Sequence, residues 1–337
     1  MTTTAPRTAP AVLAWSRDLV LPALHDAVDR LPPAMRHIAG YHLGWWDEHG
    51  RTTNTAGGKA IRSALTLLSA ESAGGSPEAA VPAAVAIELA HNFTLVHDDV
   101  LDRSHSRRNR PAAWTVFGIN AAILVGDALL ALATEVLAAS TNPTTTCVLT
   151  EALLELIDGE HTDLAFEQRD DVDISECIAM VERKTAPLLA AACALGAHFA
   201  GARPSTVNNL RGFGHLLGVA YQHVDDLLGI WGDPATTGKP AYADLRDRKK
   251  SLPVVAALTS GTPAGQELSS RYLADHSPSP AELSRLADLV EAAGGRAWSM
   301  REANRLLTEA LNLLDLAASR PAAELATLAM LITTRDR

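Results

Sequence analysis

Long runs of strong helix formers constrain the fold of this chain more than any other feature. Residues 121–140 read AAILVGDALLALATEVLAAS, and residues 151–169 read EALLELIDGEHTDLAFEQR. Both runs exceed the usual length of a β-strand and are rich in Ala, Leu and Glu. Period-2 alternation of β-branched or aromatic residues is scarce, and no Asn-Gly hairpin signal occurs. The sequence therefore predicts an all-α protein.

The segments between these runs are short patches of Gly, Pro and Thr, as at residues 73–77, 140–146 and 201–205. None is long enough to link two domains, and no repeat of fixed period occurs. We therefore expect one large helical domain over residues 13–335, built from about ten or more helices. Residues 1–12 lack the basic segment and apolar core of a signal peptide, so we expect them to form a disordered tail.

Composition narrows the range of partners and compartments. Lys and Arg number 29 against 39 Asp and Glu, giving a formal net charge of −10, which argues against nucleic acid or an anionic membrane surface as a partner. The three cysteines, Cys147, Cys177 and Cys193, form no close pair, so a reducing cytoplasm is expected. The most membrane-like run, residues 185–202, is Ala- and Gly-rich and contains His198, which favours a buried helix over a membrane span.

A first acidic cluster, Asp98, Asp99 and Asp102, follows the apolar helix expected over residues 84–95. Residues four apart on a helix lie on one face, so the Asp98 and Asp102 carboxylates should project together. Three close carboxylates repel one another unless a cation neutralises them. Mg²⁺ suits this role because it binds through one or two carboxylates together with substrate phosphates.

A second acidic cluster follows another apolar helix, expected over residues 213–224. Asp225 and Asp226 come directly after it, with Gln222 one turn before and Asp233 two turns later. Two helices that present carboxylates toward each other would form the mouth of a metal site, with a pocket lined by the apolar residues behind it.

Cations suited to phosphate binding are spread along the chain. They are Lys59, Arg62, Arg107, Arg108, Lys184, Lys239, Lys249 and Lys250. Taken singly, each acidic or basic pair reads more simply as a helix end or a solvated face. Their joint occurrence after two apolar helices favours a site for metal and a polyanionic substrate.

The motifs, in order, are GGKAIR (57–62), ELAHNF (88–93), DDVLDRSHSRR (98–108), GDALL (126–130), DLAFEQR (163–169), KTAPL (184–188), YQHVDDLLGIWGD (221–233) and GKPAYADLRDRKKSLP (238–253). On these motifs the chain resembles the trans-isoprenyl diphosphate synthases of the polyprenyl synthetase family, which include geranylgeranyl and farnesyl diphosphate synthases. The resemblance covers about residues 40–255, and the acidic motifs are 127 residues apart (225 − 98), as in that family. It implies a helical bundle around a central active-site cavity, the class I isoprenoid synthase fold, and a homodimer.

The resemblance also implies the chemistry. Three Mg²⁺ ions would bind the diphosphate of an allylic substrate and stabilise the charge that develops as its carbon–oxygen bond ionises. The allylic cation would then be attacked by isopentenyl diphosphate. Loss of a proton would complete a product five carbons longer.

Roles follow from the same resemblance. Asp98, Asp102 and Asp225 are expected as metal ligands, with Asp99, Asp226 and Asp233 assisting. The allylic site would comprise Arg107, Lys184, Gln222, Lys239 and Lys249, with Thr185 and Gln222 near the cation. The isopentenyl diphosphate site would comprise Lys59, Arg62, His91 and Arg108. A buried core histidine is the alternative for His91, and a solvated neighbour of Lys249 is the alternative for Lys250.

Three positions depart from the family pattern. Gly229 stands where many members have a third Asp of the second motif, for which Asp233 could substitute through water. Tyr242 stands where a Gly is expected, and Glu160 replaces a usual Gln. These departures bear on substrate choice more than on the fold.

Product length is predicted from the residues before the first acidic motif. Phe93, five residues before Asp98 and about one and a half turns along the helix, would close the floor of the tunnel, and Thr94 beside it is small. This favours geranylgeranyl diphosphate as the product, with farnesyl diphosphate second. Two other functions remain open: a class I terpene cyclase on the same fold, and a non-catalytic subunit of a prenyl synthase.

Overall fold

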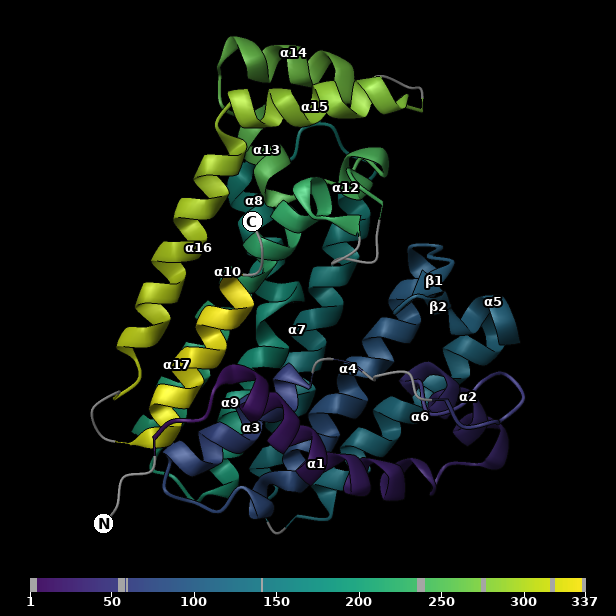
Figure 1. Cartoon of the computed structure of the whole chain (residues 1–337), viewed down its shortest axis with the longest axis vertical. Coiled ribbons are helices and arrows are strands. Elements are labelled where there is room, and N and C mark those ends of the chain that lie inside the picture. Colours follow the sequence, from purple (N-terminus) through teal and green to yellow (C-terminus); the bar gives the residue numbers. More distant parts are fainter. Residues whose placement is uncertain are drawn as a thin grey trace. The chain divides into compact units, whose positions relative to one another are not determined.

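The computed structural model describes residues 5–53, 58, 60–140, 142–234, 240–273, 277–315 and 319–334. Helices form nearly all of the regular structure in this part of the chain (Figure 1). The all-α prediction is confirmed. The two long helix-forming runs become α6 (Ile119–Ala138) and α7 (Thr144–Phe166). Both ends of α6 lie within two residues of the predicted run 121–140. α7 begins seven residues before the predicted run 151–169 and ends three residues before its end.

The chain divides into two compact units, each assembled from segments distant in sequence. The first comprises Met1–Leu153, Leu188–Arg211 and Asp315–Thr327, and the second comprises Leu154–Pro187, Gly212–Leu314 and Leu328–Arg337. The helices that contribute residues to both units are α7, α9 (Ala186–Phe199), α10 (Pro204–Trp231) and α17 (Arg320–Thr333). A single domain over residues 13–335 stays a prediction.

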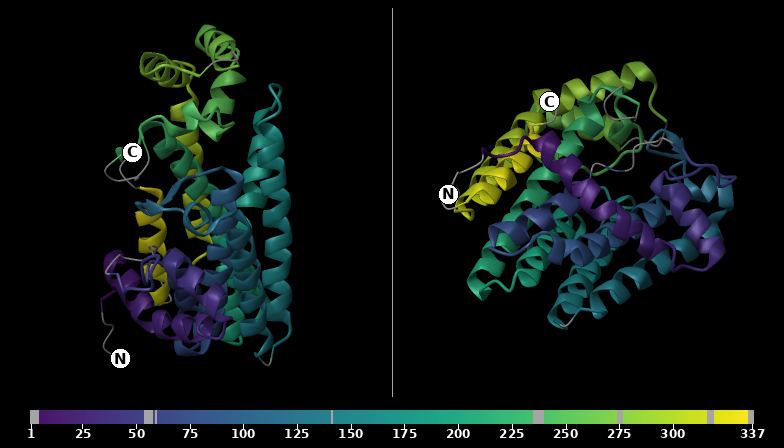
Figure 2. Two further views of the ribbon diagram at one scale, coloured as in Figure 1. Left: turned by 90° about the vertical axis from the view of Figure 1, so that its right-hand side faces the viewer. Right: turned by 60° about the horizontal axis from the view of Figure 1, so that its bottom comes forward.

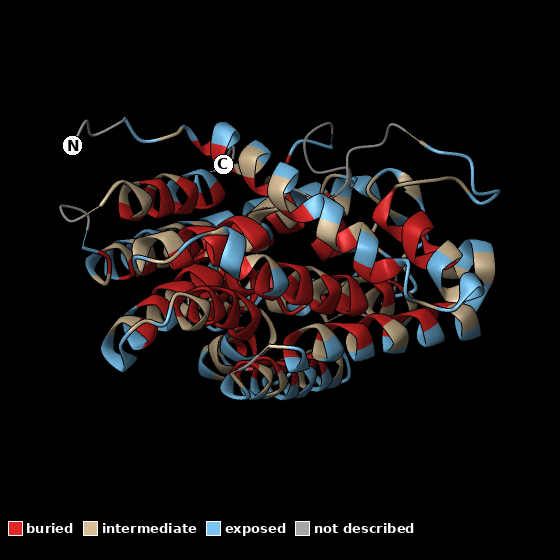
Figure 3. Cartoon of the chain, turned by 90° about the horizontal axis from the view of Figure 1, so that it is seen from below, coloured by how far each residue is buried: buried red, intermediate tan, exposed pale blue. Residues whose placement is uncertain are grey.

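The first unit is organised around α4 (Val81–Leu101). Its other elements are α1 (Ala9–Val28), α2 (Pro33–Leu43), α3 (Ile61–Ser72), the 3-10 helix η1 (Glu78–Ala80), β1 (Ser106–Arg107), β2 (Arg110–Pro111), α5 (Ala113–Phe117) and α6. α4 packs along α6 and also against α3 and α1. Residues 83–87 of α4 are all buried, because an Ala- and Val-rich helix that is apolar on all sides is stable only inside a core. Figure 3 colours the described residues by burial and shows buried and exposed residues alternating along many of the helices.

The second unit contains a layered set of shorter helices. These are α8 (Ile174–Lys184), α12 (Ala243–Arg246), α13 (Leu252–Leu258), α14 (Pro263–Tyr272), α15 (Pro280–Ala292) and α16 (Gly295–Asn312). α13 packs against α8, α14, α15 and α16, and α14 lies beside α15 (Figure 2). Capping boxes fix the starts of two of them: Asp173 with Glu176 in α8, and Ser279 with Glu282 in α15.

The N-terminal tail is shorter than predicted. α1 begins at Ala9, where the Thr8 hydroxyl caps it, so the expectation of disorder is wrong for residues 9–12. Arg7 is also fixed: its backbone N–H and its guanidinium both bond to the fully buried Glu324 carboxylate, at 2.8 and 2.9 Å. A buried carboxylate requires such a partner, and this requirement orders the segment.

Two helical segments have the length and composition to cross a membrane, namely Glu78–Leu101 and Ile119–Ala138. The first is 67% buried within the protein, and core helices of soluble proteins satisfy the same criterion. The run at 185–202 forms α9, whose residues 188–197 are all buried, so the prediction of a buried helix there is confirmed.

Candidate active site

The first acidic motif lies at the C-terminal end of α4. Asp98 and Asp99 are in the last turn, and Asp102 is the C-cap residue in helical conformation. The spacing of four therefore places the Asp98 and Asp102 carboxylates on one face, as predicted. Asp98 is partly exposed and Asp102 is exposed, whereas Asp99 is buried.

Asp99 binds a side chain of this unit. Its Oδ1 accepts hydrogen bonds from Arg107 Nε at 2.9 Å and Nη2 at 2.6 Å. Burial raises the pKa of Asp99, and the Arg107 guanidinium opposes that shift. Its other oxygen, Oδ2, is buried and has no partner among the described residues. Asp99 therefore orients Arg107, and its expected role beside the metal ligands stays a prediction.

Arg107 and Arg108 project from a hairpin that directly follows α4. β1 and β2 pair antiparallel, with Arg107 opposite Arg110, and leave Arg108 and Asn109 as a two-residue turn. Both turn residues have positive φ, 53° and 60°, as a type I′ turn requires. Gly, Asn or Asp normally occupies such positions, so an Arg there marks strain of the kind found at functional sites.

Arg62, His91 and Arg108, the described residues expected at the isopentenyl diphosphate site, lie near one another in this unit. Arg62, in the first turn of α3, donates from Nη1 to His91 Nε2 of α4 at 3.1 Å. Burial, with a further contribution from Arg62, lowers the pKa of His91 well below its ordinary value, so the ring is neutral. Gly58 of the GGKAIR motif lies beside Arg108, because a Cβ there would be only 2.9 Å from Nη2.

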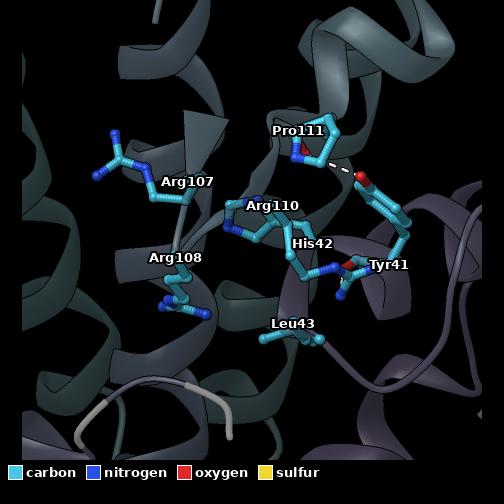
Figure 4. A pocket seen from close by; sticks show the side chains of 9 residues that line it. Tyr41, His42, Leu43, Arg107, Arg108, Arg110 and Pro111 are labelled. Carbon is cyan, nitrogen blue, oxygen red and sulfur yellow. Dashed lines mark hydrogen bonds between the residues drawn. The ribbon is translucent and has the colours of Figure 1, made fainter. Parts of the chain in front are cut away.

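A small pocket lies between this hairpin and the end of α2 (Figure 4). Arg110 closes one side of it by donating to the Tyr41 carbonyl at 3.2 Å and the Trp46 carbonyl at 2.9 Å. Its guanidinium also lies 4.4 Å from the centre of the Tyr41 ring, and the Tyr41 hydroxyl donates to the Pro111 carbonyl at 2.9 Å. Arg110 and Tyr41 thus attach the hairpin to α2.

The second acidic motif lies near the end of α10, in the second unit. Asp225 is exposed, but Asp226 is buried and both of its oxygens accept hydrogen bonds. Gln222 Nε2 donates to Oδ1 at 2.7 Å, and the Leu252 backbone N–H donates to Oδ2 at 2.8 Å. Burial raises the pKa of Asp226 to about 7, and these hydrogen bonds and Lys249 oppose the shift.

Gln222 also joins this carboxylate to the start of α9. Its Oε1 accepts a hydrogen bond from the Thr185 hydroxyl at 2.7 Å. The amide is therefore held at both ends, with its oxygen toward Thr185 and its nitrogen toward Asp226. The resemblance placed Thr185 and Gln222 near a substrate cation, which stays a prediction, and the structure shows in addition that these two side chains contact each other.

Lys184 is held between two carboxylates of α7. Its Nζ lies 2.8 Å from Glu160 and 2.6 Å from Asp163, and all three side chains are largely buried. Burial alone would lower the pKa of Lys184, but the two carboxylates outweigh it and raise the pKa. The departure at position 160 thus places a second negative charge directly on a residue expected at the allylic site.

Gly229 is explained by the approach of Asp244. A Cβ added at Gly229 would lie 2.2 Å from Asp244 Oδ2, so only glycine leaves room for this buried carboxylate. Asp244, at the start of α12, and Asp226 both raise the pKa of Lys249 against the effect of burial. An acidic group therefore lies against position 229 although the residue there is glycine.

Three further positions were singled out in the sequence. Asp233 follows the end of α10 and is exposed. Lys250 is buried, so the alternative of a solvated neighbour of Lys249 is wrong. Tyr242 has φ of 60°, the left-handed conformation that explains why glycine is expected there. Lys59 and Lys239 lie outside the described residues.

Comparison with known proteins identifies the family. The sequence profile of the polyprenyl synthetase family matches residues 45–290. The chain is 47% identical over 339 residues to a (2E,6E)-farnesyl diphosphate synthase of Mycobacterium tuberculosis, covering 98% of this chain and 94% of that protein. The chain belongs to the polyprenyl synthetase family. It is therefore a trans-prenyltransferase, a trans-isoprenyl diphosphate synthase, as the motifs predicted.

Other relatives agree on the family and differ in their products. A geranylgeranyl diphosphate synthase of Mycobacterium tuberculosis is 41% identical over 322 residues, covering 94% of this chain and 91% of that protein. The crystal structure of a polyprenyl synthetase from Streptomyces coelicolor superposes with a TM-score of 0.91 at 46% identity, covering 96% of this chain and 99% of that one. The isoprenoid synthase fold expected from the sequence is thus confirmed.

Members of this family use a divalent metal for catalysis. In the described part of the chain, no group of three or more His, Cys, Asp or Glu side chains could hold a metal ion. The carboxylates still suit Mg²⁺, because Asp98 and Asp102 share one helix face and reach solvent, and Mg²⁺ completes its shell with water and phosphate oxygens. Asp226 suits direct coordination less well, since both of its oxygens are already hydrogen-bonded.

Sequence reasoning did not assign four residues that shape these sites. Asp163 and Asp244 lie inside motifs that were recognised, and their contacts with Lys184 and Gly229 could not be read from spacing. Arg110 follows two arginines that were assigned, but its bonds are to backbone carbonyls, which leave no sequence signal. His42 lies in YHLGWW, where nothing marks it out.

Proposed function

We propose that this prenyltransferase condenses isopentenyl diphosphate with an allylic diphosphate in a Mg²⁺-dependent reaction, and that geranylgeranyl diphosphate is its main product. One observation carries the proposal. The first unit holds two distinct groups that could each serve a diphosphate: the carboxylates Asp98 and Asp102, which would do so through Mg²⁺, and a cationic group of Arg62 and Arg108. A terpene cyclase has no second diphosphate to bind and would not need the second group.

Arg108 is the residue of that group best suited to bind a diphosphate. It is partly buried, burial lowers its pKa, and it forms no ion pair with any described residue. A desolvated guanidinium gains strongly from a bidentate contact with phosphate oxygens. Arg62 and the neutral ring of His91 extend the same surface, which supports assigning isopentenyl diphosphate to it.

The residues expected at the allylic site have separate tasks in this proposal. Mg²⁺, when bound by Asp98 and Asp102 of the first unit, would supply positive charge to the departing diphosphate. In the same unit Arg107, oriented by Asp99, is assigned to the oxygens of that diphosphate. In the second unit the resemblance to the family assigns Asp225 to the metal and the lysines 184 and 249 to the diphosphate. The Thr185 hydroxyl and the Gln222 amide provide fixed dipoles near the carbon that becomes positive, which needs no reorganisation during the reaction.

Product length rests on the residues of α4 that precede the acidic motif. Phe93 and Thr94 are both buried, and the Phe93 ring contacts the His97 ring edge-on at 4.8 Å. On a regular helix, Thr94 lies on nearly the same side as Asp98, whereas Phe93 is about 140° away. A small Thr94 supports a C20 product, while the 47% identity to a farnesyl diphosphate synthase favours C15 as the second candidate.

A product assay tests the proposal. Purified protein is incubated with Mg²⁺, isopentenyl diphosphate and dimethylallyl, geranyl or farnesyl diphosphate, and the products are separated by length. An elongated diphosphate that disappears on chelation, or in Asp98→Asn protein, supports it. A hydrocarbon or alcohol would indicate a cyclase, and no product would indicate a subunit without activity.

Two substitutions test the length assignment. Phe93→Ala should lengthen the product if this ring closes the tunnel, and Thr94→Phe should shorten it. Unchanged product length in both variants would show that this turn of α4 is not the floor.

We also propose that the protein is a homodimer and works in the cytoplasm. The first unit exposes large apolar side chains on α5 and α6: Val116, Ile119, Ile123 and Leu124, the last 57% exposed. A cluster of exposed apolar residues of this kind marks an interface. Leu124→Glu should convert the dimer to a monomer in light scattering, and a wild-type monomer would refute the assignment.

A further inference from the structure

A buried histidine of α2 has an unsatisfied polar atom. His42, in the last turn of α2, is 7% exposed, and its Nε2 has no hydrogen-bond partner among the described residues. Buried polar atoms in native proteins are nearly always paired, so a bound ligand or a water molecule is a candidate partner for this nitrogen. His42 takes part in no step assigned above.

The ring lines the pocket described above, whose other polar walls are the arginines of the hairpin (Figure 4). Two of these arginines are already engaged: Arg110 by the Tyr41 and Trp46 carbonyls, and Arg107 by Asp99. Arg108 has no such partner. The pocket therefore contains one uncommitted cation, among the residues the structure describes, and one uncommitted ring nitrogen.

The charge state of His42 suits this place. Burial, together with the neighbouring Arg108 and Arg107, lowers the pKa of His42 to about 3. A neutral imidazole can carry its proton on Nε2 and donate it without adding a further positive charge beside three arginines. Such a group strengthens the binding of an anion and does not repel the cations needed for the same task.

We propose that His42 is a substrate-binding residue, which donates a hydrogen bond from Nε2 to an oxygen of the diphosphate held by Arg108. The assignment rests on the proposed function, in which that diphosphate belongs to isopentenyl diphosphate. It adds a donor from α2 to a site otherwise formed by α3, α4 and the hairpin.

A water molecule is the competing explanation for the unsatisfied nitrogen. Asn92 is 2% exposed, and a hydrogen-bonding interaction of its side chain raises the pKa of His42, although neither Asn92 Oδ1 nor His42 Nε2 has a partner in good hydrogen-bond geometry among the described residues. A water between them would satisfy both atoms and give His42 a purely structural role. Stability and substrate binding respond differently under these two explanations.

The test replaces His42 by Leu and by Gln in the full-length protein. If Nε2 binds diphosphate, His42→Leu should raise KM for isopentenyl diphosphate by about 10- to 100-fold, the loss expected for one hydrogen bond to a charged group. KM for the allylic substrate should stay within about two-fold, and His42→Gln, which retains a donor, should recover part of the loss. The melting temperature without substrate should not fall, since Leu removes an unsatisfied polar atom.

His37→Leu is the matched control, because His37 is on the same helix and its ring bonds to the Glu48 carbonyl outside the pocket. Equilibrium binding of isopentenyl diphosphate and of inorganic diphosphate is measured by calorimetry with chelator present. This measurement tests the role of His42 separately from the proposed function of the protein. If wild-type and His42→Leu proteins bind equally, and the variant is less stable, the nitrogen holds a structural water and the proposal is overturned. If the wild-type protein neither binds nor elongates isopentenyl diphosphate, the proposed function itself fails.

Discussion

Gly229 offers a direct test of how the second acidic motif is built. The substitution Gly229→Ala adds one carbon atom, which would lie 2.2 Å from Asp244 Oδ2 and 2.4 Å from its Cγ. No carbon and oxygen atoms tolerate that separation, so either Asp244 turns away or α10 shifts. In both cases Lys249 loses the neighbouring charge that contributes most to raising its pKa.

Two opposing effects set the magnitude. Alanine stabilises a helix interior by up to about 1 kcal/mol relative to glycine. Overpacking costs about 1–3 kcal/mol, and separating a buried carboxylate from its cation costs about 3–5 kcal/mol when no other partner replaces it. Asp244 is only 8% exposed, so solvent screens little of this loss. If Asp244 turns away, the overlap is relieved and the overpacking cost does not apply, which leaves about 3–5 kcal/mol for the separated pair less about 1 kcal/mol gained from alanine. We therefore expect Gly229→Ala to reduce the free energy of unfolding by about 2–4 kcal/mol.

Urea unfolding of three proteins measures the effect. Gly212→Ala is the control, because Gly212 also lies in α10 and its added Cβ would meet only the flexible Leu313 side chain, at 3.0 Å. The control should be as stable as the wild-type protein or slightly more stable. The double variant Gly229→Asp/Asp244→Ala moves the carboxylate from one residue to the other and should recover stability and turnover that each single change loses.

A Gly229→Ala protein as stable and as active as Gly212→Ala would contradict this prediction. Asp244 would then have another position open to it, and its place against Gly229 would be incidental. Failure of the double variant alone, with both single variants impaired, would show that the backbone position of the carboxylate matters as well as its charge.

Three further predictions follow from the same contacts. Burial lowers the pKa of His42 in the folded protein to about 3, below its ordinary 6.5. As the pH falls, the unfolded chain therefore protonates His42 before the folded protein does, and the free energy of unfolding decreases below about pH 6.5. His42 alone should lower the free energy of unfolding by about 1.4 kcal/mol between pH 7.5 and 5.5, and urea titrations of His42→Leu should lack that part. Glu160→Gln leaves Lys184 with one carboxylate, so the lysine should bind a substrate phosphate more strongly. KM for the allylic substrate should fall several-fold in steady-state assays, equivalent to about 1 kcal/mol of binding free energy. An unchanged or higher KM would contradict this expectation. Arg108→Asn suits the positive φ of the turn, so it should raise the melting temperature while it also raises KM for isopentenyl diphosphate. A variant with a lower melting temperature and a higher KM would show that Arg108 also supports the fold.

Much of the fold and part of the site could be predicted from the sequence because both follow local rules. Helix formers over long runs gave α6 and α7, and a spacing of four placed Asp98 and Asp102 on one face. The apolar runs before each acidic motif are indeed interior helices. The N-terminal boundary was wrong because the order of residues 7–12 depends on Glu324, more than 300 residues away.

Long-range contacts decided the features that spacing could not give. The partner of Arg107, Asp99, lies within the same motif. The other contacts cross between elements: Lys184 pairs with carboxylates of α7, and Gly229 lies against Asp244 of α12. Arg110 donates to a carbonyl of α2. In each case a charge is fixed by a group on another element, and no periodicity in the sequence predicts such a pairing.

Three residues near the predicted substrate-binding cations contradict the local backbone preference of their positions. A turn that favours Asn or Gly carries Arg108, a position that favours glycine carries Tyr242, and a helix interior that favours alanine carries Gly229. Each choice opposes local preference by about 1 kcal/mol or more, which only a gain elsewhere can offset. For Gly229 that gain is the place of a carboxylate beside Lys249. For Arg108 no comparable contact is found among the described residues, and the proposed function supplies one in the diphosphate assigned to the hairpin.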